Sequence, residues 1–224
     1  MCNLYSFGSP GGVMDAANKA LGKKISLGAS AGNLPEGYVG ADSNGPIIRH
    51  AGDGLEIDIL RWGFPPTSPK DKDGKWAPPI TNIRNLESRW WQDVNREYLL
   101  RPEYRCLVPF ASFSEPVPGK GRENAWFETT EAQGFFAGIW RAWSGDTRLV
   151  AVEGKSRRQR AAAELELYAF LTTEPNAVVE PIHPKAMPVI LTDPDELAAW
   201  MAGGEASLRL QRPLPASELR HIPS

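Results

Sequence analysis

Cysteine and histidine are scarce in this sequence, and they lack the spacings with which they bind structural metals. The 224 residues include two cysteines, Cys2 and Cys106, and three histidines. Neither a CxxC pair nor an HExxH motif occurs, so no zinc site is predicted. Since 42% of the residues are hydrophobic, a chain of this length can form a core without a disulfide.

Long apolar runs and an excess of one charge are also missing. The apolar runs are only a few residues long, which predicts no membrane-spanning helix and no membrane partner. The first residues lack a basic stretch followed by an apolar one, so the expected compartment is the cytoplasm. Lys and Arg total 25 against 27 for Asp and Glu. This balance excludes a strongly basic, histone-like protein but allows a local basic groove.

The turn-rich pattern predicts an α+β fold with a largely antiparallel, barrel-like β core and a few peripheral helices. No repeat or linker is found, so residues 1–224 are expected to form one domain. Residues 46–62 predict a β-hairpin, because apolar and acidic residues alternate from Leu55 to Ile59. Helices are expected at 87–100, at 15–21 and after the capping residue Asp193. Further strands are expected at 106–110, 125–128, 135–140, 148–152, 167–172 and 188–191.

Cys2 is the first candidate for chemistry. If Met1 is removed, the chain begins with an α-amine and a thiol on adjacent carbons, titrating near about 8 and about 8.5. The amine can attack an aldehyde to give an imine, and the thiol can then close a five-membered thiazolidine ring in an intramolecular step. On position alone, an incidental cysteine on a mobile chain end is the simpler interpretation.

Three further segments carry candidate polar groups, and each has a structural alternative. Asn82 and Arg84 would lie on one face of an extended segment. An amide and a guanidinium on the same face are suited to orienting a nucleophile beside a phosphate. Glu115 follows an apolar strand, where desolvation would raise the pKa of its carboxyl. His183 lies on a proline-flanked loop and could act as acid or base. Taken singly, a half-buried strand, a solvent-facing acid and a structural histidine are the simpler interpretations.

Residues 155–160 (KSRRQR) carry four positive charges in six positions. A solvated loop is the simpler interpretation of such a run, and a loop that contacts phosphate is the alternative. The sequence alone does not separate the two.

Together these segments resemble the SRAP family, the SOS response-associated peptidases, whose members shield abasic sites in DNA. The resemblance runs in family order from residue 1 to about residue 191. It rests on residues 1–6 (MCNLYS), 61–66 (RWGFPP), 81–84 (TNIR), 105–109 (RCLVP), 113–115 (FSE), 137–140 (AGIW), 170–173 (FLTT) with Asn176, and 182–188 (IHPKAMP).

The resemblance implies a covalent thiazolidine between Cys2 and the opened sugar of an abasic site, preferably in single-stranded DNA, with no cofactor and no metal. It implies that Asn82 positions the Cys2 amine, Glu115 shuttles protons and His183 assists as acid or base. The same residues would remove Met1 by autoproteolysis, and a lyase activity is also implied. A monomer is expected, associated with the nucleoid when it is bound to DNA.

Expected DNA contacts come from Arg84 and Lys185 on phosphates and from Trp76, which could stack on an unpaired base for about 1–3 kcal/mol. Many family members have an arginine soon after Cys2, where this chain has Asn3 and Leu4, and many have an arginine at the position of Lys185. A lysine binds phosphate as a point charge without the bidentate fork. Two other functions stay open: a thiol peptidase acting on peptides in trans, and a non-covalent single-stranded DNA-binding domain.

Overall fold

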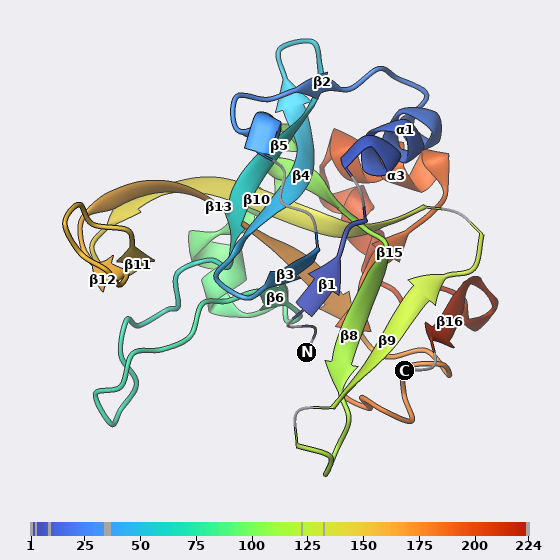
Figure 1. Cartoon of the computed structure of the whole chain (residues 1–224). Coiled ribbons are helices and arrows are strands. Elements are labelled where there is room, and N and C mark those ends of the chain that lie inside the picture. The colour runs from blue at the N-terminus through green and yellow to red at the C-terminus, as the bar shows by residue number, and fades with distance from the viewer. Residues whose placement is uncertain are drawn as a thin grey trace.

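Five strands close into a β-barrel at the centre of the fold (Figure 1). The computed structural model describes residues 2, 4–8, 10–33, 37–121, 123–131 and 133–222. The ring closes because β5 pairs in parallel with β13, with Trp62 opposite Tyr168. The order around it is β13 (Ala163–Thr173), β10 (Gly134–Gly145), β7 (Arg105–Phe110), β4 (Asn44–Ala51) and β5 (Gly54–Trp62). This confirms the predicted α+β class with a largely antiparallel, barrel-like core.

Short strands and a second sheet surround the barrel. The second sheet has the order β16 (Leu219–Ile222), β9 (Asn124–Thr129), β8 (Ser112–Pro116), β1 (Leu4–Ser6) and β3 (Tyr38–Gly40). The strands added to the barrel are β2 (Ser26–Leu27), β6 (Asn82–Ile83), β14 (Met187–Pro188) and β15 (Ile190–Leu191). A separate pair consists of β11 (Leu149–Val150) and β12 (Gln159–Arg160).

The helices are short and lie outside the barrel. The α-helices are α1 (Pro10–Leu21), α2 (Arg96–Leu100) and α3 (Pro194–Ala202). The π-helical turn is η2 (Trp90–Val94), and the 3₁₀ turns are η1 (Ala31–Asn33), η3 (Pro102–Tyr104), η4 (Glu205–Leu210) and η5 (Ala216–Glu218). No helix within the described ranges is long and apolar enough to cross a membrane.

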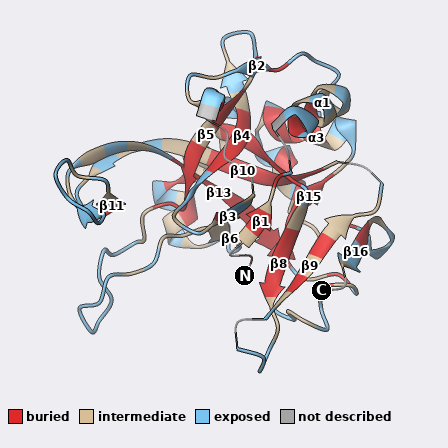
Figure 2. Cartoon of the chain, viewed as in Figure 1, coloured by how far each residue is buried: buried red, intermediate tan, exposed pale blue. Residues whose placement is uncertain are grey.

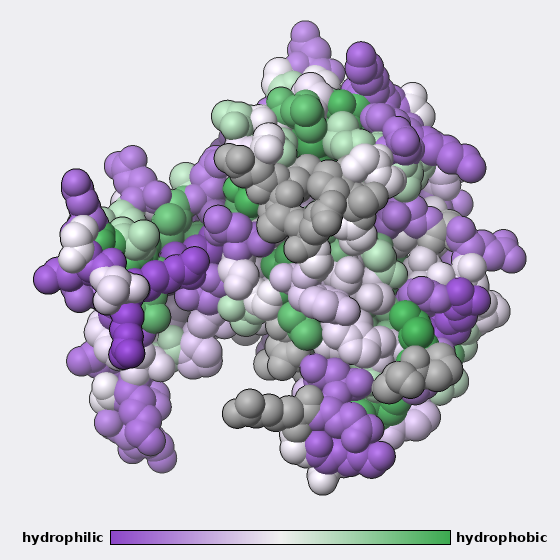
Figure 3. All heavy atoms as spheres, in the orientation of Figure 1, coloured by the Kyte–Doolittle hydropathy of each residue, from purple (hydrophilic) through white to green (hydrophobic). Residues whose placement is uncertain are grey.

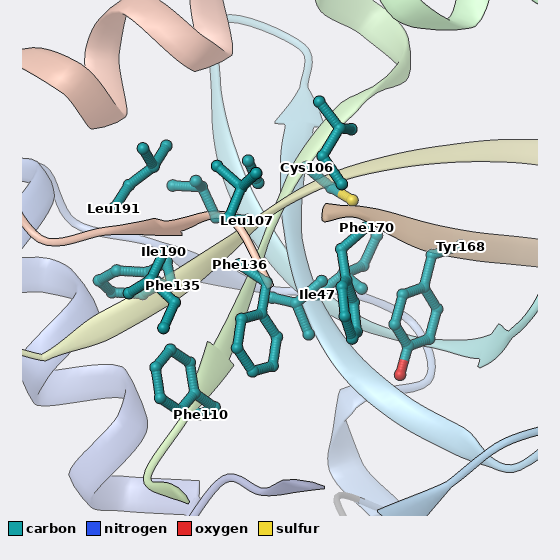
Figure 4. Close-up of a cluster of buried hydrophobic side chains, with 14 of the residues drawn as sticks. Ile47, Cys106, Leu107, Phe110, Phe135, Phe136, Tyr168, Phe170, Ile190 and Leu191 are labelled. Atoms are coloured by element: carbon teal, nitrogen blue, oxygen red, sulfur yellow. The ribbon is translucent and has the colours of Figure 1, made fainter. Parts of the chain in front are cut away.

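Aromatic side chains fill the interior of the barrel (Figure 4). The rings of Phe110 and Phe136 stack with centroids 4.1 Å apart, and Phe170 lies 4.5 Å from Phe136. Burial of such rings stabilises the fold because each removes a large apolar area from water. Figure 2 shows the buried residues concentrated on the barrel strands and on β8, whereas the outer loops are exposed.

Gly45 on β4 is required by a close contact at one end of the barrel. The hydroxyls of Tyr5 and Tyr168 form a buried hydrogen bond of 2.6 Å. A Cβ at position 45 would collide with the Tyr168 hydroxyl and would lie 2.5 Å from that of Tyr5. We expect Gly45→Ala to lower the free energy of unfolding by about 1–3 kcal/mol, as overpacked cores do. Denaturant unfolding measures this.

A matched substitution separates this clash from a general effect of adding a methyl group. A Cβ at Gly11, in α1, meets nothing within 4 Å. Gly11→Ala should therefore leave the free energy of unfolding unchanged or raise it by up to about 1 kcal/mol. Equal stability of Gly45→Ala and the wild type would contradict the packing argument.

Local signals predicted two elements well. The 46–62 hairpin is confirmed as β4 and β5, joined at residues 52 and 53. The start of α3 is also confirmed, because the Asp193 carboxylate accepts hydrogen bonds from the backbone N–H groups of Asp195 and Glu196 at 2.8 and 3.1 Å. A capping carboxylate satisfies N–H groups that have no partner within the helix.

The predicted continuous helix at 87–100 is wrong. The segment forms η2 and then α2, with a break at Asn95, whose φ is −119°. The Asn95 side chain donates to the Trp90 carbonyl at 3.0 Å and accepts from Arg141 at 3.2 Å. These bonds replace the regular helical pattern, since an asparagine side chain competes with the backbone.

The expected strands at 148–152 and 188–191 also differ from the structure. Only Leu149–Val150 is extended in the first. The second splits into β14, which pairs with β13, and β15, which pairs with β10. The chain changes partner at Val189, whose N–H still donates to the Leu171 carbonyl at 2.9 Å.

Candidate active site

Cys2 lies two residues before β1. Strand β1 lies between β3 and β8, with Leu4 opposite Ser114. The Cys2 thiol is fully buried and lies 3.6 Å from the Leu4 carbonyl oxygen. Burial raises the pKa of the thiol well above its ordinary value, and the negative charge of Glu115 raises it further. A thiolate at Cys2 therefore requires a nearby base to accept the proton. Met1 lies outside the described residues.

Asn82 contacts Cys2 directly. Its side-chain Nδ2 donates to the Cys2 carbonyl at 2.9 Å and to Thr81 Oγ1 at 2.8 Å. Strand β6 holds this amide in place by pairing in parallel with β13, with Asn82 opposite Phe170. Its Oδ1 is buried and accepts no hydrogen bond from any described residue. A buried carbonyl oxygen of this kind favours an incoming donor, such as an amine.

Glu115 comes from the second sheet. A single residue, Ala111, separates β7 from β8, and Glu115 is the fourth residue of β8 rather than the end of the apolar strand before it. Its side chain is fully buried. Burial raises the pKa of the carboxyl from 4.5 to about 7. A carboxyl with such a pKa can both give and take a proton near neutral pH.

His183 completes the group. Its Nδ1 lies 3.9 Å from Glu115 Oε2 and 2.7 Å from the Ala186 carbonyl oxygen. The Ala186 N–H also lies 3.3 Å from Nδ1, so the contacts with Ala186 fit either neutral tautomer, and the shorter contact, with the carbonyl, favours a proton on Nδ1 with Nε2 as the acceptor. Desolvation lowers the pKa of His183 below its ordinary value, and the charges of Lys185 and Arg84 act in the same direction. The imidazole is therefore neutral near pH 7.

Asn176, noted in the sequence, supports the loop that carries His183. Its Oδ1 accepts from the backbone N–H groups of Val178 and Val179, both at 3.1 Å. Its Nδ2 donates to the Leu214 carbonyl at 2.9 Å. The turn continues with the His183 N–H donating to the Val179 carbonyl at 2.9 Å. Asn176 thus contributes to the position of His183 through the backbone.

The other predicted site residues lie in two places. Arg84 and Lys185 are exposed, and both act electrostatically on His183. Trp76 is 43% exposed, and its ring is contacted by Arg160 at 4.0 Å and by Lys70 at 5.0 Å. Within the described ranges, no contact joins Trp76 to Cys2, Asn82, Glu115 or His183. A base that stacks on Trp76 would have to share its ring with these cations.

Thr172 was not singled out as a site residue in the sequence. It lies on β13 two residues beyond Phe170, the partner of Asn82. Its Oγ1 is buried and bonds to no described residue. The hydroxyl-rich run FLTT at 170–173 is the only signal in the sequence that could have indicated it.

The molecular surface is hollowed between two projections of the chain. The side lobe, which we define as residues 66–78 and 150–160, projects from the barrel on one side, and the β8–β9 hairpin projects on the other (Figure 1). Strands β1 and β6 lie between them. Figure 3 shows the space-filling surface hollowed between these two projections. Chain segments far apart in sequence thus border one concave surface.

Comparisons with known proteins bear on the family and the fold of the chain. The family model described as SOS response associated peptidase (SRAP) matches residues 10–223. A search of curated proteins finds no match.

Solved structures with the same fold come from two bacteria. A protein from Bordetella bronchiseptica has 19% identity and a TM-score of 0.69, with 100% of each chain covered. A protein from Bacteroides thetaiotaomicron has 20% identity and a TM-score of 0.66, covering 99% of this chain and 91% of its own. A phage-related protein from Bordetella bronchiseptica has 17% identity and a TM-score of 0.62, covering 100% and 94%.

Proposed function

Because the chain belongs to the SOS response-associated peptidase (SRAP) family, we propose that it shields abasic sites in single-stranded DNA by a covalent thiazolidine crosslink through Cys2. One observation carries the proposal: Asn82 is hydrogen-bonded to Cys2, His183 lies 3.9 Å from Glu115, and the charge of Glu115 acts on the Cys2 thiol, although the four residues come from four separate segments. These residues supply a thiol nucleophile, an amide oxygen that accepts hydrogen bonds, a carboxyl whose pKa is about 7, and a neutral imidazole.

The first step is removal of Met1. The Cys2 thiol attacks the Met1 carbonyl carbon and passes its proton to Glu115, which is the nearby base that the raised thiol pKa requires. The peptide C–N bond breaks and the nitrogen leaves as an amine after taking a proton. Water then hydrolyses the thioester, which releases methionine and restores the thiol. The chain now begins with a free aminothiol at Cys2.

The second step joins the aminothiol to the opened sugar. The amine adds to the aldehyde carbon of the abasic deoxyribose, and Asn82 Oδ1 accepts an N–H to orient it. Protonated Glu115 then donates a proton to the departing hydroxyl, so that water leaves and an imine forms. The thiol sulfur adds to the imine carbon, and its proton ends on the ring nitrogen. His183 Nε2 accepts protons from the sugar hydroxyls during ring opening.

Two exposed basic residues beside His183 support DNA binding. Arg84 and Lys185 are exposed near His183, where they can hold phosphates on either side of the reacting sugar. We further propose that residues 1–224 act as one domain and as a monomer in the cytoplasm, associated with the nucleoid when bound to DNA. Lyase activity would arise when the imine undergoes β-elimination before the ring closes.

A denaturing gel tests the proposal together with a mass measurement. We expect an oligonucleotide with a natural abasic site to give a heat-stable shifted band, and the purified protein to have an N-terminal peptide that starts at Cys2. Cleavage of unrelated peptides without a shifted band would instead indicate a peptidase acting in trans. Binding that does not survive denaturation would indicate a non-covalent DNA-binding domain.

A further inference from the structure

The side lobe concentrates positive charge in a chain that is otherwise acidic. It carries seven basic and three acidic residues, a formal charge of +4. The whole chain has a charge of −2, so the remainder has −6. All of the basic residues are exposed: Lys70, Lys72, Lys75, Lys155, Arg157, Arg158 and Arg160. The lobe therefore attracts anions although the protein as a whole does not.

These cations have no acidic partners among the described residues. Ion pairs involve arginines elsewhere, such as Arg49 with Asp58 at 2.7 Å and Arg61 with Asp42 at 2.7 Å. In the described part of the chain, no ion pair involves a basic residue of the side lobe. The lobe's net positive charge therefore attracts solvent counterions, which a polyanion can displace with a gain in entropy.

The lobe is internally ordered. The Asp71 carboxylate accepts from the backbone N–H groups of Asp73 and Lys75, both at 2.9 Å, which closes a tight turn. Lys70 pairs with Trp76 as an isolated β-bridge. The Trp76 ring then joins the two segments, because Arg160 lies over it at 4.0 Å. One of the three acids is thus used within the turn, and the cations are held on a defined scaffold.

The lobe is also anchored to the barrel. Asp42 pairs with both Arg61 and Arg148. Arg61 donates to the Leu149 carbonyl at 2.7 Å, and Arg148 donates to the Gly63 carbonyl at 2.9 Å. These bonds fix the root of β11 and β12 against the end of β5. Binding at the lobe therefore needs little ordering of the chain, which favours affinity.

The root of the lobe lies close to the site. Pro78 is four residues before Asn82, which at about 3.5 Å per extended residue limits their separation to roughly 14 Å. Asn82 in turn bonds to the Cys2 carbonyl at 2.9 Å. Strand β6, which carries Asn82, lies between the two projections in Figure 1, and the side lobe borders the hollow in Figure 3. A strand held at Cys2 can thus reach the root of the lobe within a few nucleotides.

We propose that the side lobe binds the phosphate backbone of the DNA strand flanking the abasic site. This inference rests on the proposed function, since it takes that DNA as the ligand. It assigns the basic run at 155–160 to phosphate contact, and it gives Trp76 the role of holding Arg160 in the lobe. The lobe binds phosphates without reading bases, because its contacts are charged side chains on exposed turns.

The test measures the salt dependence of non-covalent binding. The ligand is a single-stranded oligonucleotide with a tetrahydrofuran abasic analogue, which has no aldehyde and cannot form the crosslink. We compare the wild type with the combined variant Lys155→Gln, Arg157→Gln, Arg158→Gln. Each phosphate contact on a single strand contributes about 0.7 to the slope of log K against log salt, so we expect the slope to fall by about 2. Between 50 and 200 mM salt the wild type should lose about 16-fold more affinity than the variant.

A matched control carries Lys19→Gln, Lys23→Gln and Lys24→Gln, three exposed lysines at and after the end of α1. It removes the same charge from another face and should keep the wild-type slope. Equal slopes for the 155–158 variant and the wild type would overturn the proposal, as would an equal loss in the control. A wild type that forms no adduct with a natural abasic site would instead refute the crosslinking function, while the slopes on the analogue still report on the lobe.

Discussion

Replacing Cys2 with alanine should abolish the heat-stable adduct with abasic DNA. The substitution removes the sulfur that attacks the Met1 carbonyl and that later closes the ring. Even where a separate peptidase removes Met1 and frees the amine at position 2, an imine is the last species that can form. We expect the yield of stable adduct on a denaturing gel to fall below detection. Since alanine is smaller than cysteine and also apolar, and the hydrogen bond from the thiol to the Leu4 carbonyl is long at 3.6 Å, the fold should persist.

Two further variants make this result specific. Cys106 is the other buried cysteine, on β7, and burial raises the pKa of its thiol as well. Cys106→Ala should therefore crosslink at the wild-type yield, which separates the role of Cys2 from a general need for thiols. Cys2→Ser, prepared with Met1 removed by a separate aminopeptidase, should give an imine that borohydride traps, with some strand cleavage, but little stable adduct. A wild-type yield of stable adduct from Cys2→Ser would refute the ring-closing step.

Replacing Glu115 with glutamine should slow crosslinking by about 10²–10⁴-fold, the usual contribution of a positioned acid or base. The amide keeps the shape of the side chain but cannot donate a proton to the departing hydroxyl. In the wild type the crosslinking rate should decline above pH 7, because burial places the pKa of Glu115 at about 7. Quenched time courses across this pH range measure both effects. A wild-type rate in Glu115→Gln would remove Glu115 from the mechanism.

The same substitution should not destabilise the protein above neutral pH. The pKa of Glu115 rises from 4.5 to about 7 on folding. Between these values the folded state keeps a proton that the unfolded chain has lost, so the free energy of unfolding falls as pH rises from about 4.5 to 7. At about 1.4 kcal/mol per pH unit, the free energy of unfolding has fallen by on the order of 3 kcal/mol above pH 7. Glu115→Gln removes this loss, and denaturant unfolding at pH 8 should find the variant at least as stable as the wild type.

A control for both readouts is Glu123→Gln, in the loop after β8. Glu123 is exposed and pairs with Lys120 at 3.4 Å, a surface contact that contributes little to stability. This variant should keep the wild-type crosslinking rate and the wild-type dependence of stability on pH. A loss of rate in Glu123→Gln as large as in Glu115→Gln would indicate that the effect is not specific to the buried carboxyl.

Elements with strong local signals could be predicted from the sequence. The alternation from Leu55 to Ile59 indicates one buried and one exposed face, which is the pattern of β5 in the hairpin with β4. Asp193 before Pro194 indicates a helix start because capping depends on neighbouring residues alone. The 87–100 segment has the right helical periodicity, but its break at Asn95 depends on Arg141 of β10, a residue that local patterns do not connect to it.

The sequence by itself determined the family and the barrel-like α+β class, because the family's motifs follow one another in order along the chain. Through that resemblance it also predicted Cys2, Asn82, Glu115 and His183 as site residues. Only the tertiary structure decided that Cys2 is buried beside strand β1 instead of lying on a loose end, that burial raises the pKa of Glu115 to about 7, and that the basic run at 155–160 joins Trp76 in one lobe. These depend on pairing between segments tens to more than a hundred residues apart, and desolvation and cation–π contact arise only when such segments are packed together.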